Sequence, residues 1–291
     1  MRVIEYKAEP YFEGKKLICF LRGHVKISVR LLRSLKRVEG AIKINGENAR
    51  TIDILHAGDT VTLSIPEDES HSIPIDYDLK IVYEDEDVLV IDKPAMLPMH
   101  ESHNHQGDTL ANAVAGYLSK KGKSLAFRAV GRLDKGTSGL VICALNSHTA
   151  ARLSGNFEKT YYAMATGKYE GTGTIDKPIY RPDPMKTYRT ADDRGDRAVT
   201  HYEVLESAEN YSLLKIQLET GRTHQIRVHF AYLGTPLYGD RMYGEEHPLI
   251  GRQALHCAKV SFTHPVTGKK IELTAELPED MQSLRKAITD N

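Results

Sequence analysis

Residues 131–145 read GRLDKGTSGLVICAL, a turn-forming stretch followed by an apolar run. An Arg-Leu-Asp step runs into residues 136–139, GTSG, which predict a tight turn, and the apolar residues 140–145 predict a strand. Such a turn could offer backbone N–H groups to the carboxylate of Asp134. Asp134 is therefore either a reacting group or a residue that only orders the turn, and this stretch leaves both readings open.

A second cluster follows at residues 158–167, EKTYYAMATG, where two tyrosines stand side by side at the start of a predicted strand. Neighbouring side chains of a strand point to opposite faces, so Tyr161 and Tyr162 cannot both face one site. The alternative is that both tyrosines only pack.

A third cluster spans residues 218–244, LETGRTHQIRVHFAYLGTPLYGDRMYG, and places Arg222, His224, Arg227 and His229 within eight residues. We expect QIRVH to be extended, so that Arg227 and His229 share one face. A buried Arg must find a carboxylate, and Asp134 is a plausible partner. A solvated basic strand is the alternative.

Length and composition limit the class of protein. The chain has 291 residues, which favours about two domains. Its three cysteines are scattered without a CxxC pair, so neither a disulfide framework nor a cysteine zinc site is indicated. The N-terminus lacks the apolar stretch of a signal peptide, and no apolar run reaches the roughly 20 residues that span a bilayer. We expect a cytoplasmic protein with no membrane segment.

Charge is unevenly distributed, although 39 Lys and Arg balance 39 Asp and Glu. Between Lys15 and Lys43 nine basic residues face one acidic residue. There a helix is expected from Ser28 as the N-cap to Gly40, with Val29, Leu32 and Leu35 on its apolar face. The other side carries Arg30, Arg33, Lys36 and Arg37, which we interpret as a phosphate-binding face because like charges repel unless a partner neutralises them. A merely solvated helix is the alternative.

The pattern divides the chain into three parts: a small basic unit at residues 1–66, a polar linker at 67–77, and a larger domain at 78–291. Strands are expected at residues 41–46, 60–65, 87–94 and 211–219, and helices at 108–118, opened by Asp108, and at 147–157. Without a βαβ rhythm, the fold class is α+β: a mixed, mainly antiparallel sheet with flanking helices, plus a small N-terminal α/β module.

Five motifs, in order, resemble the RluA-type pseudouridine synthases: IDKPAML from Ile91, GRLDKGTSGL from Gly131, KTYYAMATG from Lys159, LETGRTHQIRVH from Leu218 and LGTPLYGDRMYG from Leu233. The match covers about residues 78–280. Gly131 stands where the family commonly has His, and Ala95 where Gly is usual. VKISVRLLRSLKRVEGAIKINGE from Val25 and LHAGDTVTL from Leu55 resemble an RNA-binding module first recognised in a ribosomal small-subunit protein.

The resemblance implies an isomerase that detaches uracil from ribose at N1, rotates it and reattaches it through C5. Asp134 would be the essential carboxylate, Arg227 its partner, and Tyr161 a ring that stacks on uracil and serves as a base. Arg132, Arg222 and His224 would contact RNA, and Arg132 would fill the stack that a flipped nucleotide leaves. The partner would be ribosomal or transfer RNA. No cofactor or metal is implied, and the chain shows no GxxxxGK[ST] or GxGxxG nucleotide-binding motif. We expect a monomer.

Two other classes remain open. His100, His103 and His105 lie in the loop HESHNH and could bind zinc, although no HExxH motif accompanies them. A non-catalytic RNA-binding protein that uses only its surface is the second alternative.

Overall fold

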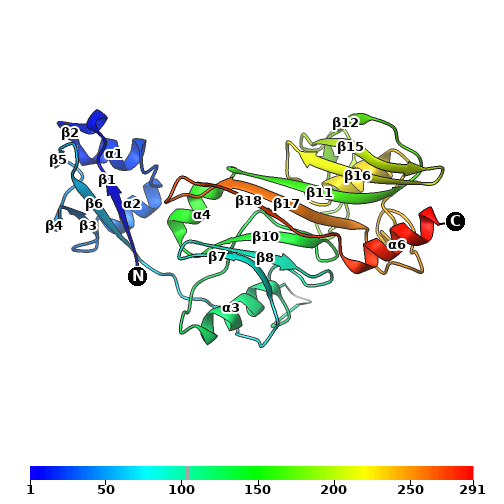
Figure 1. Cartoon of the computed structure of the whole chain (residues 1–291), viewed down its shortest axis with the longest axis horizontal. Coiled ribbons are helices and arrows are strands. Elements are labelled where there is room, and N and C mark those ends of the chain that lie inside the picture. Colours follow the sequence, from blue (N-terminus) through cyan, green and yellow to red (C-terminus); the bar gives the residue numbers. More distant parts are fainter. Residues whose placement is uncertain (103–104, 291) are drawn as a thin grey trace.

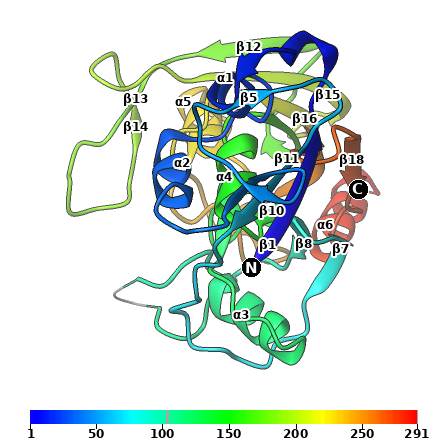
Figure 2. The same cartoon turned by 90° about the vertical axis from the view of Figure 1, so that its left-hand side faces the viewer.

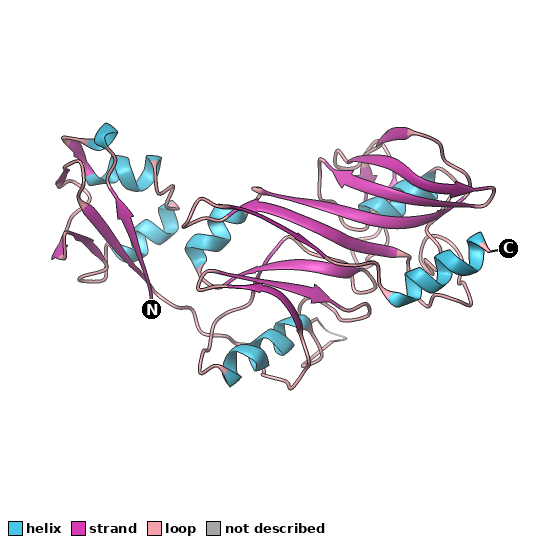
Figure 3. Cartoon of the chain, in the orientation of Figure 1, coloured by secondary structure: helices cyan, strands magenta, loops and turns pink. Residues whose placement is uncertain are grey.

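The structure is a computed structural model that describes residues 1–102 and 105–290. It consists of a small N-terminal body and a larger body, joined by an irregular segment between Ile65 and Lys80 (Figures 1 and 3). Each body has its own apolar core. The α+β class with a mainly antiparallel sheet is confirmed: among the described residues, the pairing of β10 with β17 is the only parallel one.

The N-terminal body packs two short helices against small antiparallel sheets. β1, β6, β3 and β4 pair in that order, and β2 pairs with β5. The elements are β1 (Arg2–Lys7), a 3-10 helix (Pro10–Phe12), β2 (Lys15–Lys16), α1 (Leu17–Gly23), α2 (Val29–Leu35), β3 (Ile42–Ile44), β4 (Glu47–Asn48), β5 (Ile54–Leu55) and β6 (Thr60–Ile65). The expected strands at 41–46 and 60–65 are therefore present.

Helix α2 begins as predicted, because the Ser28 hydroxyl accepts a hydrogen bond from the backbone N–H of Leu31 at 3.1 Å. Its apolar face differs from the prediction. Leu32 and Leu35 are buried, but Val29 is 48% exposed and Leu31 is buried instead. Val29 lies in the first turn, beyond the edge of the core that the later residues cover.

In the larger body, strands pair in the order β12-β15-β16-β11-β17-β10-β8-β7, while β18 adds to β17 and β9 to β10. Its strands are β7 (Lys80–Glu84), β8 (Val88–Lys93), β9 (Arg128–Val130), β10 (Ser138–Ala144), β11 (Phe157–Thr166), β12 (Thr172–Asp176), β13 (Ile179–Tyr180), β14 (Thr190–Ala191), β15 (Val199–Ala208), β16 (Tyr211–Leu218), β17 (Leu255–Thr263) and β18 (Lys270–Thr274). Its helices are α3 (Leu110–Lys120), α4 (Ser147–Leu153), α5 (Gln225–Tyr232) and α6 (Glu279–Thr289).

Both faces of the central strands are covered, so alternate residues of one strand are buried in two different apolar clusters. Leu214 and Ile216 of β16 join the core that includes residues of α3 and α5, whereas Leu213 faces the cluster built with α6. The same alternation in β11 sends Tyr161 into the first core and Tyr162 toward the second, as predicted. The segment between β13 and β14 projects away from the body (Figure 2).

Further local predictions are wrong. Helix α2 ends at Leu35 rather than at Gly40, and α4 ends at Leu153 rather than at residue 157. The 108–118 helix is capped by Thr109 rather than Asp108, because Thr109 and Asn112 form a reciprocal capping box. QIRVH is the start of helix α5 and not a strand. The missed signal is the four-residue spacing of Ile226 and Phe230, which both enter the core. His229 therefore does not share a face with Arg227, and its ring nitrogens bind the hydroxyl of Thr200 and the carbonyl of Lys177, both at 2.9 Å.

The segment predicted as a linker is irregular but is tied to the larger body. The carbonyl of Ile73 accepts from the side chain of Asn112 at 2.9 Å, and Asp68 pairs with Arg128. Gly116 of α3 lies so close to this segment that a Cβ atom there would meet the carbonyl oxygen of Ile75 at 1.9 Å. These contacts hold the segment along α3.

Candidate active site

A cleft of about 700 Å³ opens in the larger body, and six of the predicted site residues line it. They come from the β9–β10 turn, from β11, from the segment that leads into α5 and from α5 itself: Arg132, Asp134, Tyr161, Arg222, His224 and Arg227. Arg30, Arg33, Lys36 and Arg37 do not line it, because they lie in and just after α2 of the N-terminal body.

Asp134 is placed by the turn between β9 and β10. The turn is closed by a hydrogen bond from the backbone N–H of Thr137 to the carbonyl of Asp134, at 3.0 Å. Beyond it, Gly139 has a φ of +106°, and a Cβ atom there would meet the carbonyl oxygen of Cys257 at 2.2 Å, so only glycine lets β10 pair this closely with β17. The expected backbone N–H donors to the carboxylate of Asp134 are not found among the described residues, and side chains take that role.

The Asp134 carboxylate is held through one oxygen. Arg227 Nη1 donates to Asp134 Oδ2 at 3.2 Å, and His224 Nε2 lies 3.8 Å from the same oxygen. Oδ1 has no hydrogen-bond partner among the described residues. With 16% of its side chain exposed, Asp134 therefore presents one free oxygen at the cleft.

Arg227 has a second and stronger partner that the sequence analysis missed. Its Nε and Nη2 donate to the two oxygens of Asp240 at 2.7 and 2.8 Å, and the Asp240 side chain is fully buried. Burial opposes the charge of Arg227, but the hydrogen bonds and charge of Asp240 outweigh it and raise the pKa of the guanidinium. The signal was available in the motif GDRMYG, residues 239–244, whose acidic residue was passed over.

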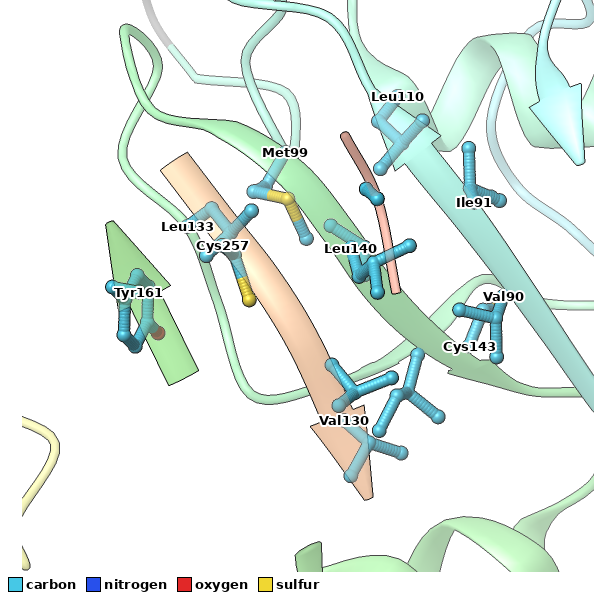
Figure 4. Close-up of a cluster of buried hydrophobic side chains, with 14 of the residues drawn as sticks. Val90, Ile91, Met99, Leu110, Val130, Leu133, Leu140, Cys143, Tyr161 and Cys257 are labelled. Carbon is cyan, nitrogen blue, oxygen red and sulfur yellow. The ribbon is translucent and has the colours of Figure 1, made fainter. Parts of the chain in front are cut away.

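Tyr161 lines the cleft. Its side chain belongs to the same buried cluster as Leu133 and Cys257 (Figure 4). It is 7% exposed, and its hydroxyl has no hydrogen-bond partner in the described part of the chain. Burial raises the pKa of Tyr161 well above its ordinary value, so the phenol stays protonated at neutral pH. The role of Tyr161 as a base stays a prediction.

Two lysines near the site were also missed. The amino group of Lys93 donates to the carbonyls of Pro94, Leu97 and Lys135, which braces the turn next to Asp134, and burial lowers its pKa to about 7. The amino group of Lys159 is buried in the cleft wall without a hydrogen-bond partner among the described residues, and burial lowers its pKa.

The two departures from the family pattern have different structural consequences. Gly131 has a φ of +74°, and a Cβ atom there would meet Phe157 at 2.8 Å and Lys159 Nζ at 3.3 Å, so these side chains use the space that a larger residue would need. Ala95 does not have a positive φ, and the left-handed backbone lies one residue later, at Met96 with φ 65°. The strained position is therefore Met96.

Two of the three histidines that could bind zinc, His100 and His105, contact other groups in the structure. His105 Nδ1 lies 2.7 Å from Asp108, and its Nε2 is 3.2 Å from the Lys135 amino group, a cation. His100 packs on the ring of Phe127. His103 lies outside the described residues.

Among the described residues, another group has metal-ligand spacing: Asp85, Asp87 and His264. Protein donors already occupy it, because Arg2 donates to both oxygens of Asp87, at 3.0 and 2.7 Å, and Asp85 Oδ1 accepts two backbone N–H groups. Since Arg2 comes from β1, this cluster joins the two bodies. No helix in the described residues is long and apolar enough to cross a membrane.

Known proteins are similar to this chain over most of its length. A family model described as RNA pseudouridylate synthase matches residues 87–232. An RNA pseudouridine synthase called YjbO, described as uncharacterized, from Bacillus subtilis is 37% identical over 276 residues, covering 91% of this chain and 96% of that protein. The ribosomal large subunit pseudouridine synthase D of Zymomonas mobilis is 39% identical, covering 79% and 78% of the two chains. The solved structure of human RNA pseudouridylate synthase domain containing 1 has a TM-score of 0.56 and 25% identity, covering 74% of this chain and 96% of that one.

Proposed function

The chain belongs to the RNA pseudouridylate synthase family, and from that premise we propose that it converts uridines of large-subunit ribosomal RNA to pseudouridine at the Asp134 cleft. The choice of RNA is supported by relatives that are named for the large ribosomal subunit, such as the 39% identical Zymomonas mobilis protein. Transfer RNA is the second candidate, and the two RNAs are compared directly in the experiment below.

The observation that carries the proposal is the arrangement of Asp134. Arg227 binds one oxygen and leaves Oδ1 without a hydrogen-bond partner among the described residues, in a cleft that Tyr161 also lines. In the reaction the bond between N1 and C1′ breaks and a bond between C5 and C1′ forms; the proton on C5 is released to solvent, and N1 takes up a proton in its place. A fixed, ionised carboxylate suits this chemistry because it stabilises positive charge at the sugar carbon or bonds to the substrate.

Tyr161 would then stack on the flipped uracil as a neutral phenol. Its buried ring provides a flat apolar face in the cleft, and burial raises the pKa of its hydroxyl, so the ring meets the base uncharged. A base inside a helix must leave its stack to reach this ring, at a cost of a few kcal/mol. Arg132 is exposed at the rim of the cleft and has no ion-pair partner among the described residues, which suits it to fill the vacated stack or bind a phosphate.

The N-terminal body, residues 1–66, would be an RNA-binding module, with residues 67–77 as its connection to the catalytic domain at 78–291. Its basic side chains on and after α2 are all exposed, and none has an ion-pair partner in the described part of the chain: Arg30, Arg33, Lys36 and Arg37. Each contact with a phosphate adds close to one unit to the slope of the logarithm of the binding constant against the logarithm of the salt concentration. The double variant Arg30→Glu/Arg33→Glu should therefore bind RNA more weakly and with a flatter salt dependence. An unchanged slope would make these residues a solvated surface.

The reaction is tested with RNA transcribed with uridine tritiated at C5. The wild-type protein should release tritium from large-subunit ribosomal RNA, and Asp134→Asn should release none while its RNA affinity stays close to that of the wild type. Asp76→Asn, an exposed carboxylate in the connecting segment, is the matched control and should keep full activity. Release only from transfer RNA would change the substrate, and RNA binding without release would identify a non-catalytic RNA-binding protein.

A further inference from the structure

His224 has an unusual backbone and a central position in the site. It precedes α5 with a φ of 59°, in the left-handed region that residues other than glycine rarely adopt. Such conformations persist where the surrounding structure holds them, and they cluster at functional sites. Here the conformation directs the imidazole between two groups: Tyr243 Oη lies 2.8 Å from Nδ1, and Asp134 Oδ2 lies 3.8 Å from Nε2.

The hydrogen bonds of Tyr243 determine which imidazole nitrogen carries the proton. The Tyr243 hydroxyl oxygen accepts from the backbone N–H of Arg189 at 3.0 Å. Its own proton needs an acceptor, and among the described residues His224 Nδ1 is the only one in reach. The hydroxyl therefore donates to Nδ1, and a neutral imidazole must carry its hydrogen on Nε2.

The other side of the ring requires the same tautomer. An ionised carboxylate only accepts hydrogen bonds, so a bare Nε2 would place two lone pairs opposite each other, whereas Nε2–H points a donor at Asp134. Burial lowers the pKa of His224 and raises that of Tyr243 to about 12, which keeps both groups neutral at physiological pH. Tyr243 and Asp134 thus both require the Nε2–H tautomer of His224.

We propose that Tyr243 and His224 position Asp134 for the reaction: the hydroxyl of Tyr243 fixes the Nε2–H tautomer of His224, and this N–H directs Asp134 Oδ2 so that Oδ1 faces the nucleoside. The proposal rests on the proposed function of Asp134 and adds two positioning residues to it. The distance of 3.8 Å is longer than a hydrogen bond, and we expect it to shorten when RNA binds, because catalytic hydrogen bonds are often long without substrate.

Because the backbone N–H of Arg189 orients the hydroxyl, the segment between β13 and β14 takes part in this chain of contacts. Tyr188 of the same segment stacks on Tyr243, with ring centroids 5.2 Å apart and an angle of 27° between the planes. A displacement of this segment would therefore disturb the proton arrangement next to Asp134.

The first test needs no RNA. Nitrogen-15 NMR of the imidazoles should show the Nε2–H tautomer for His224, assigned by the signal that His224→Gln removes. In Tyr243→Phe the fixed donor is lost, and we expect the Nδ1–H tautomer or the imidazolium to become populated. An Nδ1–H tautomer in the wild type would overturn the proposal, whether or not the protein proves to be a synthase.

The second test measures single-turnover tritium release and RNA affinity separately. Tyr243→Phe and His224→Phe should each slow the chemical step about tenfold or more, because a hydrogen bond to a charged group is affected, with little change in affinity. His224→Gln keeps an N–H donor and should recover part of the rate. Tyr162→Phe is the matched control, because Tyr162 faces the other side of β11 and does not line the cleft.

The double variant separates a shared role from two independent ones. If Tyr243 acts through His224, adding Tyr243→Phe to His224→Phe should slow the reaction no further. Effects that multiply, or losses confined to RNA affinity, would refute the positioning role. An inactive wild type would instead refute the proposed function, and the tautomer measurement would still decide the proton arrangement.

Discussion

Asp240 is the fully buried carboxylate that fixes the direction of Arg227, and replacing it with the neutral amide should weaken that hold. Asp240→Asn keeps an oxygen that can still accept from the backbone N–H groups of Met242 and Tyr243, but it removes the charge opposite Arg227. The guanidinium would remain 7% exposed, with the oxygen of Asp134 at 3.2 Å as its remaining carboxylate partner.

Breaking a buried ion pair by removing one partner typically costs 3–5 kcal/mol, since a charge is left without compensation. Because Asp134 still compensates part of that charge, we expect about 3 kcal/mol, at the lower end of the range. For a chain of this size, each kcal/mol lowers Tm by about 2–4 °C, so the expected shift is about 6–12 °C. Activity should fall as well, because Arg227 loses the two hydrogen bonds that fix its direction.

The assay is thermal unfolding followed by circular dichroism, together with single-turnover tritium release. Asp134→Asn is the comparison: it removes the carboxylate that is partly exposed at the cleft, so it should abolish release while changing Tm by only a few degrees. If Asp240→Asn unfolds within about 2 °C of the wild type, the buried ion pair does not hold Arg227 in the way described here.

Three further predictions concern stability. Met96→Gly should raise the free energy of unfolding by up to about 1 kcal/mol in urea denaturation, because Met96 is 54% exposed and only its φ of 65° is costly; a loss of stability would contradict this. Gly116→Ala should destabilise α3 by about 2 kcal/mol or more despite the better helix propensity of Ala, since its Cβ would clash with Ile75, and wild-type urea stability would refute the clash. Burial lowers the pKa of His148 to about 4, so the unfolded chain binds more protons between pH 4 and 6.5, and the contribution of this residue to stability falls as pH drops through that range. Wild type should lose about 2 kcal/mol more than His148→Gln between pH 7 and pH 5, and equal losses would show that His148 is not responsible.

Much of the secondary structure followed from local patterns. The apolar runs at residues 88–91 and 140–144 lie in strands because a buried strand needs little beyond continuous apolar residues and a turn at each end. The opposite directions of Tyr161 and Tyr162 follow from the two-residue repeat of a strand. The prediction for QIRVH failed because the alternating charged residues were weighted over the four-residue spacing of Ile226 and Phe230, which both pack into the core.

The sequence by itself determined the family and the residues that its motifs share, because motif residues and their order are properties of the chain. Only the tertiary structure decided which atoms meet: that Asp240 is the main partner of Arg227, that Asp134 keeps Oδ1 free, and that His224 stands between Tyr243 and Asp134. Asp134 and Arg227 are 93 positions apart, and the direction of each hydrogen bond depends on every neighbour of the donor and acceptor. That information arises only when distant segments pack together.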